Sequence, residues 1–323
     1  MLSAPALIEL VGLRVAFDGV FVLHGIDLAI ARGEAVGMVG ESGSGKSVTW
    51  LGALGLLPPN RAQVLGSARL GGQELVGAAP NELAEVRGGR IGLIFQDPVS
   101  ALNPVHRVGA QIAEAAIRHR ALSAAAARAE ARRLLDQVGI PDAGRRLDSY
   151  PHELSGGQNQ RAMIAMALAG QPDLLIADEP TTALDTTIQA QILDLLDTLR
   201  RETGMALVLI SHDLSVVGEV CDRIVVMYAG RIVEEAPTAA LLGSPAHPYT
   251  KGLLAAVPPL LGPRHRLAAI PGDVAQPGKL PPGCAFAPRC SDAIDACSLT
   301  VPGFWEIAAG QRAACIRLAA VAP

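Results

Sequence analysis

The chain has 323 residues, of which 50% are apolar and 18% charged, with 27 basic and 31 acidic side chains and a formal net charge of −4. This slightly acidic balance lacks the excess of positive charge that binds the phosphates of nucleic acid, so we expect no nucleic-acid partner. Charged residues, Gly or Pro interrupt every apolar run before the ~20 residues of a membrane helix, and the N-terminal residues do not fit a secretory signal. We therefore exclude an integral membrane protein and expect a folded cytoplasmic protein of about two structural units.

Residues 1–30 alternate between apolar and polar side chains with period two, which is typical of half-buried antiparallel strands. Next, residues 35–39 form a short apolar run that is followed by a glycine-rich loop. Similar runs, with helical stretches between several of them, occur at residues 91–95, 174–177, 207–210 and 224–227. This alternation predicts a parallel α/β sheet that is buried on both faces.

Two segments between these strands carry helix signals with a visible end. Residues 47–57 are expected to form a helix that Pro58-Pro59 stops. Residues 188–202 are expected to form another, because Gly204 stands at the position of a C-terminal cap.

A helical insertion and a C-terminal extension are also expected. Residues 123–138 are rich in Ala and Arg, and no strand-like run lies between residues 111 and 166, which predicts a helical subdomain at about residues 97–165. Prolines become frequent after the last predicted strand. We therefore expect a core of residues 1–240 and a separate extension of residues 241–323.

Residues 40–47 read Gly-Glu-Ser-Gly-Ser-Gly-Lys-Ser and fit the phosphate-binding pattern G-x-x-x-x-G-K-[ST] between a strand and a helix. Glycines let backbone N–H groups close around phosphate oxygens, and the following helix directs its positive dipole end toward them. Lys46 is expected to contact the β- and γ-phosphates of ATP, and Ser47 to bind Mg²⁺. The expected nucleotide-binding residues of this loop are Gly40, Glu41, Ser42, Gly43, Ser44, Gly45, Lys46 and Ser47.

A second motif, at residues 174–179, is an apolar strand that ends in Asp178 and Glu179. Ligands of α/β sheets bind at the carboxyl ends of the strands. Asp178 suits Mg²⁺, directly or through water, and Glu179 suits a base that deprotonates the attacking water. Taken alone, the pattern is more often that of an ordinary solvated strand end.

A third motif, Leu154-Ser-Gly-Gly-Gln158, precedes a helical stretch and forms a second candidate anion-binding site. This string resembles the signature motif of ABC-type ATPases, in which it completes the ATP site of a partner chain. The resemblance implies an α/β fold of the ABC P-loop type, with a mixed-sheet core, an antiparallel β subdomain and a helical subdomain. Its nucleotide-binding residues would be Ser155, Gly156, Gly157 and Gln158.

The same resemblance implies roles for residues outside these three motifs. Gln96 resembles the catalytic glutamine that contacts Mg²⁺ and the attacking water, and His212 the catalytic histidine that contacts the γ-phosphate. Asp185 resembles the aspartate that contacts the opposing site of a dimer. Phe17 stands where the family places an aromatic ring against adenine, with Phe21 as a less suitable substitute.

Four of the five cysteines lie near the C-terminus with the spacing C-x5-C-x6-C-x17-C, at Cys284, Cys290, Cys297 and Cys315. Four thiols in an intracellular segment favour a metal over disulfides. The spacing does not select between zinc, an iron–sulfur cluster and unliganded thiols. Cys221 lies in an apolar context and is expected to be a buried small residue.

Two segments resemble the C-terminal extension of oligopeptide/dipeptide (peptide/nickel) importer ATPases. They are residues 271–290, from Pro-Gly-Asp to Phe-Ala-Pro-Arg-Cys, and the string His-Pro-Tyr-Thr at residues 247–250. This resemblance implies a [4Fe-4S] cluster on the four cysteines. It also implies a protein at the cytoplasmic face of the inner membrane, whose ATP hydrolysis powers peptide uptake.

The implied partners are two transmembrane permease subunits, a second ABC ATPase that is typically a paralogue and, indirectly, an extracytoplasmic solute-binding protein. Nickel chelates and glutathione are alternative substrates. Alternative functions are a soluble ABC ATPase without a permease and a regulator that senses redox state through the cysteines.

Overall fold

The computed structural model describes residues 6–96, 101–182, 184–257 and 269–320. The chain divides into two compact units. Unit 1 comprises residues 1–30, 35–77 and 210–323, and unit 2 comprises residues 31–34 and 78–209. Each unit contains both β-strands and helices.

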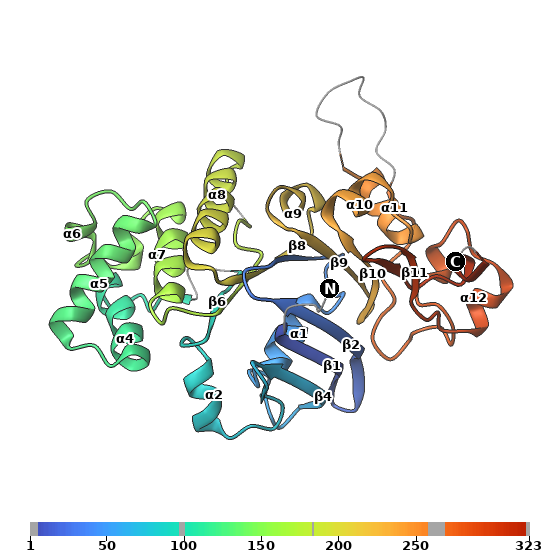
Figure 1. Cartoon of the computed structure of the whole chain (residues 1–323), viewed down its shortest axis with the longest axis horizontal. Coiled ribbons are helices and arrows are strands. Elements are labelled where there is room, and N and C mark those ends of the chain that lie inside the picture. The colour runs from blue at the N-terminus through green and yellow to red at the C-terminus, as the bar shows by residue number, and fades with distance from the viewer. Residues whose placement is uncertain (1–5, 97–100, 183, 258–268, 321–323) are drawn as a thin grey trace. The chain divides into compact units, whose positions relative to one another are not determined.

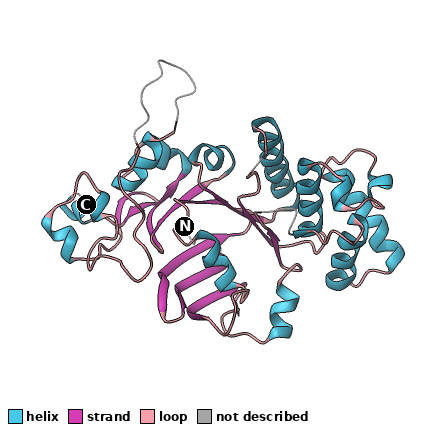
Figure 2. Cartoon of the chain, turned by 180° about the vertical axis from the view of Figure 1, so that it is seen from behind, coloured by secondary structure: helices cyan, strands magenta, loops and turns pink. Residues whose placement is uncertain are grey.

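Unit 1 contains a four-stranded sheet in the order β2-β1-β4-β5, built from β1 (Ala6–Phe17), β2 (Val20–Ala31), β4 (Ala62–Leu70) and β5 (Gln73–Glu74). β1 pairs antiparallel with β4, and β4 pairs antiparallel with β5. The strands lie side by side in Figure 2. The period-two alternation of residues 1–30 therefore predicted strands correctly.

Unit 1 also contains five strands in the order β11-β12-β10-β9-β3: β3 (Ala35–Val39), β9 (Arg223–Tyr228), β10 (Arg231–Pro237), β11 (Trp305–Ala308) and β12 (Gln311–Ala313). β3 and β9 are parallel, whereas β9–β10, β10–β12 and β11–β12 are antiparallel. The sheet is therefore mixed, as the resemblance implied: β3 and β9, which come from the predicted apolar runs, are parallel, and every antiparallel pair contains β10 or β12, which those runs did not include. The reason is local: Ala229 (φ 44°) and Gly230 (φ 75°) both have positive φ, which closes a tight hairpin between β9 and β10.

The helices of unit 1 are α1 (Lys46–Ala53), α9 (Leu214–Val220), α10 (Thr238–Gly243), α11 (Pro248–Ala255) and α12 (Asp295–Leu299), with short 3₁₀ turns at Ala287–Arg289 and Ile316–Ala320. α1 ends before the predicted residue 57, because Gly55 turns the chain with a φ of 62°. Through β12, residues 241–323 join the sheet of unit 1 at β10. The boundary at residue 240 stays a prediction.

Unit 2 contains β6 (Ile91–Ile94), β7 (Leu174–Asp178) and the first residues of β8 (Ala206–Ser211), in the order β8-β7-β6. β6 and β7 are parallel, with Ile94 opposite Ala177. The strands β7 and β8 are almost wholly buried, as their continuous apolar runs predicted.

The helices of unit 2 are α2 (Pro80–Val86), α4 (Val108–Arg120), α5 (Ala124–Gln137), α6 (Ala143–Arg146), α7 (Gly156–Leu168) and α8 (Thr186–Thr203), with a 3₁₀ turn at Pro151–Glu153. α4, α5 and α7 pack on one another (Figure 1). α8 ends at Gly204, which has the left-handed φ of 69° that its cap position predicted. Within the described ranges, no helix is both long and apolar enough to cross a membrane.

Candidate functional site

The loop of residues 40–47 joins β3 to α1 inside unit 1. Gly40 has a φ of 153°, and a Cβ atom there would lie 2.3 Å from the carbonyl oxygen of Met227. Gly45 has a φ of 103°, and its Cβ would lie 2.6 Å from Leu23 Cδ2. Only glycine fits both positions, because side chains rarely adopt this φ and these contacts are too short. The loop can therefore curl back on itself with its backbone close to β9.

Lys46 is buried at the start of α1, with 6% of its surface exposed. Its Nζ donates hydrogen bonds to the carbonyl oxygens of Gly40 (2.7 Å) and Glu41 (3.1 Å) and to Ser44 Oγ (3.4 Å). The ammonium therefore lies inside the curl of the loop. A cation held there, beside backbone N–H groups and a helix N-terminus, is suited to bind phosphate oxygens.

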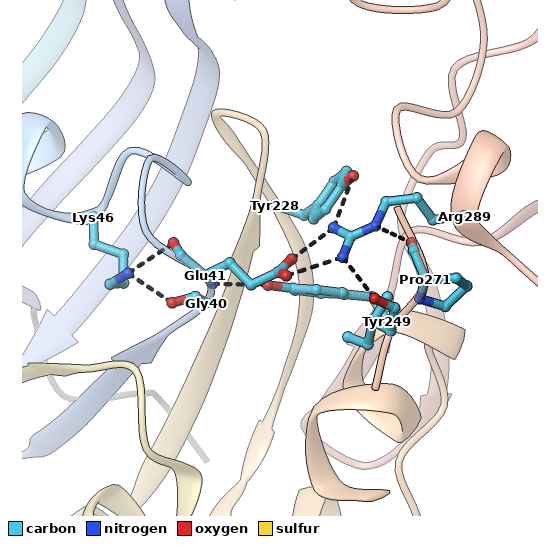
Figure 3. Close-up of polar contacts among 8 residues, drawn as sticks. Gly40, Glu41, Lys46, Tyr228, Tyr249, Pro271 and Arg289 are labelled. Atoms are coloured by element: carbon cyan, nitrogen blue, oxygen red, sulfur yellow. Dashed lines mark hydrogen bonds and ion pairs between the residues drawn. The ribbon is translucent and has the colours of Figure 1, made fainter. Parts of the chain in front are cut away.

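Glu41 is held by residues of the C-terminal extension (Figure 3). Arg289 donates two hydrogen bonds to its carboxylate, at 2.7 and 3.0 Å, and the backbone N–H of Glu41 donates to the hydroxyl of Tyr249 at 2.8 Å. The hydrogen bond to Glu41 raises the pKa of Arg289, and burial raises the pKa of Tyr249. The sequence predicted Glu41 as a nucleotide-binding residue but gave no role to Arg289 or Tyr249, although both lie in the strings that resemble the importer extension.

Unit 2 brings two predicted catalytic residues together at one edge of its sheet. Because β6 and β7 run parallel and in register, Gln96 and Glu179 both follow the same ends of neighbouring strands. Gln96 Nε2 donates to Glu179 Oε2 at 3.3 Å. Thr182 Oγ1 donates to the same oxygen at 2.9 Å, a contact that sequence reasoning missed. The arrangement holds a carboxylate in a fixed place, next to Asp178 at the end of β7.

Glu179 also has a left-handed backbone, with a φ of 46°. For a residue with a side chain this conformation costs about 1–2 kcal/mol. The N–H of Thr182 donates to the carbonyl of Glu179 at 3.2 Å and helps to hold the turn. Strain of this kind gathers at functional sites, where it aims a side chain.

The signature-like string begins α7 of unit 2. Ser155 is the N-cap, its Oγ accepts from the N–H of Gln158 at 3.3 Å, and Gln158 Oε1 accepts from the N–H of Ser155 at 3.1 Å. This capping box leaves Ser155 and Gly156 exposed at the helix N-terminus. The end of α7 is therefore suited to an anion brought by another molecule.

Four further residues that the sequence predicted for the site have the following positions. Phe17 is the half-buried last residue of β1, and Phe21 lies on β2 with 36% of its surface exposed. His212 is exposed directly after β8. Asp185 caps α8, since its side chain accepts from the N–H of Ile188 at 2.9 Å. Their roles toward nucleotide stay predictions.

The four C-terminal cysteines line one cavity in unit 1, together with His247 and Phe286. The cysteines are Cys284, Cys290, Cys297 and Cys315. Burial raises the pKa of the Cys284 and Cys290 thiols, so both favour the protonated form. In the part of the chain that the structure describes, no group of three or more His, Cys, Asp or Glu side chains is arranged to hold a metal ion. Thiolates are the ligands of iron–sulfur clusters, but the arrangement of the described residues supports neither a cluster nor a single metal ion.

Comparison with known families matches residues 23–182 to the ABC transporter family, and residues 233–297 to the C-terminal region of oligopeptide/dipeptide transporters. A putative peptide import ATP-binding protein of Brucella abortus is 47% identical over 97% of this chain and 96% of that protein. A probable peptide ABC transporter ATP-binding protein of Sinorhizobium fredii is 51% identical over 91% of this chain and 89% of that protein. The oligopeptide transport ATP-binding protein OppD of Mycobacterium tuberculosis is 51% identical over 96% of this chain and 52% of that protein.

Solved structures agree with these matches. The ATP-binding cassette MJ0796, solved as a dimer in a post-hydrolysis state with ADP and Pi, has a TM-score of 0.64 and 29% identity. It covers 72% of this chain and 98% of its own. The protein cbiO1 of Clostridium perfringens, part of the transporter complex cbiONQ, has a TM-score of 0.65 and 28% identity, and covers 74% of this chain and 91% of its own.

Proposed function

Because this chain belongs to the ABC transporter family, we propose that it is the ATP-hydrolysing subunit of an importer that carries oligopeptides or dipeptides across the cytoplasmic membrane. The observation that carries the proposal is its likeness, at 47–51% identity and over more than nine tenths of its length, to peptide import ATP-binding proteins. The match of residues 233–297 to the C-terminal region of peptide transporters supports the same substrate class.

In the proposed reaction, the phosphate loop and Lys46 bind the phosphates of ATP, and Phe17 packs against adenine. The buried ammonium of Lys46 and the curl of residues 40–47 support the first role. Oxygen donors suit Mg²⁺, and the proposed donors are Ser47, Asp178 and Gln96. A bound Mg²⁺ would neutralise charge that develops on the phosphate oxygens.

Glu179 is proposed to accept a proton from water, whose oxygen attacks the γ-phosphorus as the bond to the β–γ bridging oxygen breaks and ADP leaves. Gln96 orients that water, and His212 contacts the γ-phosphate. The hydrogen bonds of Gln96 and Thr182 to one oxygen of Glu179 support this assignment, because they hold the carboxylate in one orientation.

The exposed Ser155–Gln158 turn is proposed to complete the ATP site of a second ABC ATPase, and Asp185 to contact that chain. We propose a paralogue as this second subunit. Closure of the pair with ATP bound would bias two permease subunits between inward- and outward-facing states, because ATP binds the closed pair more tightly. A solute-binding protein outside the membrane would deliver the peptide, and this chain would act at the cytoplasmic face of the inner membrane.

Cys284, Cys290, Cys297 and Cys315 are proposed to hold a [4Fe-4S] cluster. The proposal rests on the type of these donors around one cavity, because thiolates are the ligands of such clusters. A bound cluster would cross-link the segments that carry the four cysteines. Iron and sulfide analysis of anaerobically purified chain tests the assignment, and a preparation that holds zinc, or neither iron nor sulfide, would contradict it.

The importer assignment is tested by affinity purification of the chain from mildly solubilised membranes, followed by mass spectrometry. Two polytopic permeases and a second ATPase are expected. Recovery without any membrane protein would contradict the proposal and favour a soluble ABC ATPase. The solute-binding protein encoded with the recovered permeases can then be tested against peptides, nickel chelates and glutathione.

A further inference from the structure

The C-terminal extension reaches into the phosphate loop through one arginine (Figure 3). We propose that Arg289 is a positioning residue for nucleotide binding, which neutralises the carboxylate of Glu41 and, with Tyr249, holds the loop in its phosphate-binding shape. This inference rests on the proposed ATP site, and goes beyond it by making nucleotide affinity depend on the extension.

The ion pair between Arg289 and Glu41 is bidentate, and the Arg289 side chain is almost completely buried. The two guanidinium nitrogens Nη1 and Nη2 lie 2.7 and 3.0 Å from the carboxylate oxygens, and only 5% of the Arg289 side chain is exposed. Its Nε donates to the carbonyl of Pro271 at 2.8 Å, and further contacts at 3.4 Å reach the Tyr228 hydroxyl and the Ile270 carbonyl. The guanidinium is therefore held in one geometry.

Tyr249 fixes the backbone of the same loop residue. Its hydroxyl accepts the N–H of Glu41 at 2.8 Å, while the carbonyl of Glu41 accepts from Lys46 Nζ at 3.1 Å. The Tyr249 side chain is fully buried, with ring centroids 4.8 Å from Tyr228 and 5.3 Å from Phe286. Lys46 Nζ also donates to the carbonyl of Gly40 at 2.7 Å, so the peptide group between Gly40 and Glu41 joins Lys46 to an aromatic cluster of the extension and β9.

The charge of Glu41 explains why the loop needs this partner. A carboxylate in a loop that receives phosphate groups repels them unless a cation neutralises it. Arg289 supplies that cation from a site where it has little contact with solvent, so the ion pair is weakly screened. Removal of Arg289 therefore leaves an unpaired negative charge at the phosphate site.

The position of Arg289 links the loop to the cysteine cavity. Arg289 directly precedes Cys290 and ends the 3₁₀ turn that follows Cys284 and Phe286. Phe286 packs against both Tyr228 and Tyr249. The segment that carries Cys284 and Cys290 therefore also carries the guanidinium that pairs with Glu41.

The test is a double-mutant cycle with the full chain, measured as the affinity for Mg²⁺-ADP by titration calorimetry. ADP is chosen because it is not hydrolysed. Arg289→Gln should weaken binding about 10-fold, a typical coupling between sites. Glu41→Gln added to Arg289→Gln should restore most of the loss, because it removes the unpaired charge. A purely structural tie would show no such rescue.

A matched control is Arg312→Gln. Arg312 is another arginine of the extension, and it pairs with Glu235 on β10 at 2.6 Å. We expect Arg312→Gln to bind ADP as the unchanged chain does. Equal weakening by Arg289→Gln and Arg312→Gln would overturn the proposal, because the effect would then be a general loosening of the extension.

Two further variants separate the remaining outcomes. Tyr249→Phe removes only the hydroxyl and should weaken ADP binding about threefold, so it tests the clamp even if Arg289→Gln does not fold. Lys46→Ala tests the proposed site itself. If Lys46→Ala loses ADP while Arg289→Gln, shown to be folded by its circular dichroism, binds normally, only this inference fails. If Lys46→Ala binds ADP unchanged, the proposed site and this inference both fail.

Discussion

Gly40 is a position of the glycine-rich loop at which one added methyl group should clearly destabilise unit 1. Its φ of 153° is strained for any other residue, at a cost of about 1–3 kcal/mol. In Gly40→Ala the new Cβ would lie 2.3 Å from the carbonyl oxygen of Met227, which β9 holds in register with β3 and β10. Overpacking against a fixed atom adds a cost of about 1–3 kcal/mol. We therefore expect the free energy of unfolding to fall by about 2–6 kcal/mol.

The assay is urea unfolding followed by the fluorescence of Trp50, which is 1% exposed. Gly43→Ala is the matched control in the same loop, since Gly43 also has a positive φ (79°) but its Cβ would meet nothing within 4 Å. It should lose only the conformational part, about 1–2 kcal/mol. Equal destabilisation by Gly40→Ala and Gly43→Ala would refute the reasoning, because the contact with Met227 would then have no energetic effect.

Three further predictions concern unit 2. Glu179→Gln should lower the rate of phosphate release from ATP by about 100-fold or more, because the variant has no base; a rate equal to that of the unchanged chain would remove Glu179 from this role. Thr182→Val should lower kcat about 10-fold at unchanged KM, whereas Thr182→Ser, which keeps the hydroxyl, should retain the rate. Hydrogen bonding from Arg133 lowers the pKa of Glu130 to about 2 from an ordinary 4.5, so its contribution to stability is present above pH 4.5 and is lost as the pH falls toward 2. Between pH 4.5 and pH 2, the free energy of unfolding should fall less for Glu130→Gln than for the unchanged chain. An equal fall in the two proteins would contradict the assignment.

Short-range patterns in the sequence predicted the local elements of this protein. The strand at residues 35–39 and the start of α1 near Lys46 follow from the order of an apolar run, a glycine-rich loop and a helix-forming run. The helix that ends before Gly204 was also predicted, because a left-handed cap requires glycine or a similar residue. In each case the signal lies within a few residues of the element that it specifies.

Elements whose stability depends on distant partners were not predicted. β12 is only three residues long, and its place in the sheet depends on a distant partner, since 77 residues separate Arg312 from Glu235, which lies opposite it on β10. The carboxylate of Glu179 was assigned a role from its motif, whereas its hydrogen bonds to Gln96 and Thr182 depend on the register of β6 and β7.

The contact between Arg289 and Glu41 is the plainest case, because 248 residues separate the two. The chain has 27 basic and 31 acidic side chains, and charge alone does not say which of them pair. Sequence by itself determined that residues 40–47 form a glycine-rich loop between a buried strand and a helix, because that conformation needs glycines at particular positions. Only the tertiary structure decided that an arginine of the C-terminal extension pairs with Glu41 of this loop, because the fold brings a buried guanidinium beside a half-buried carboxylate.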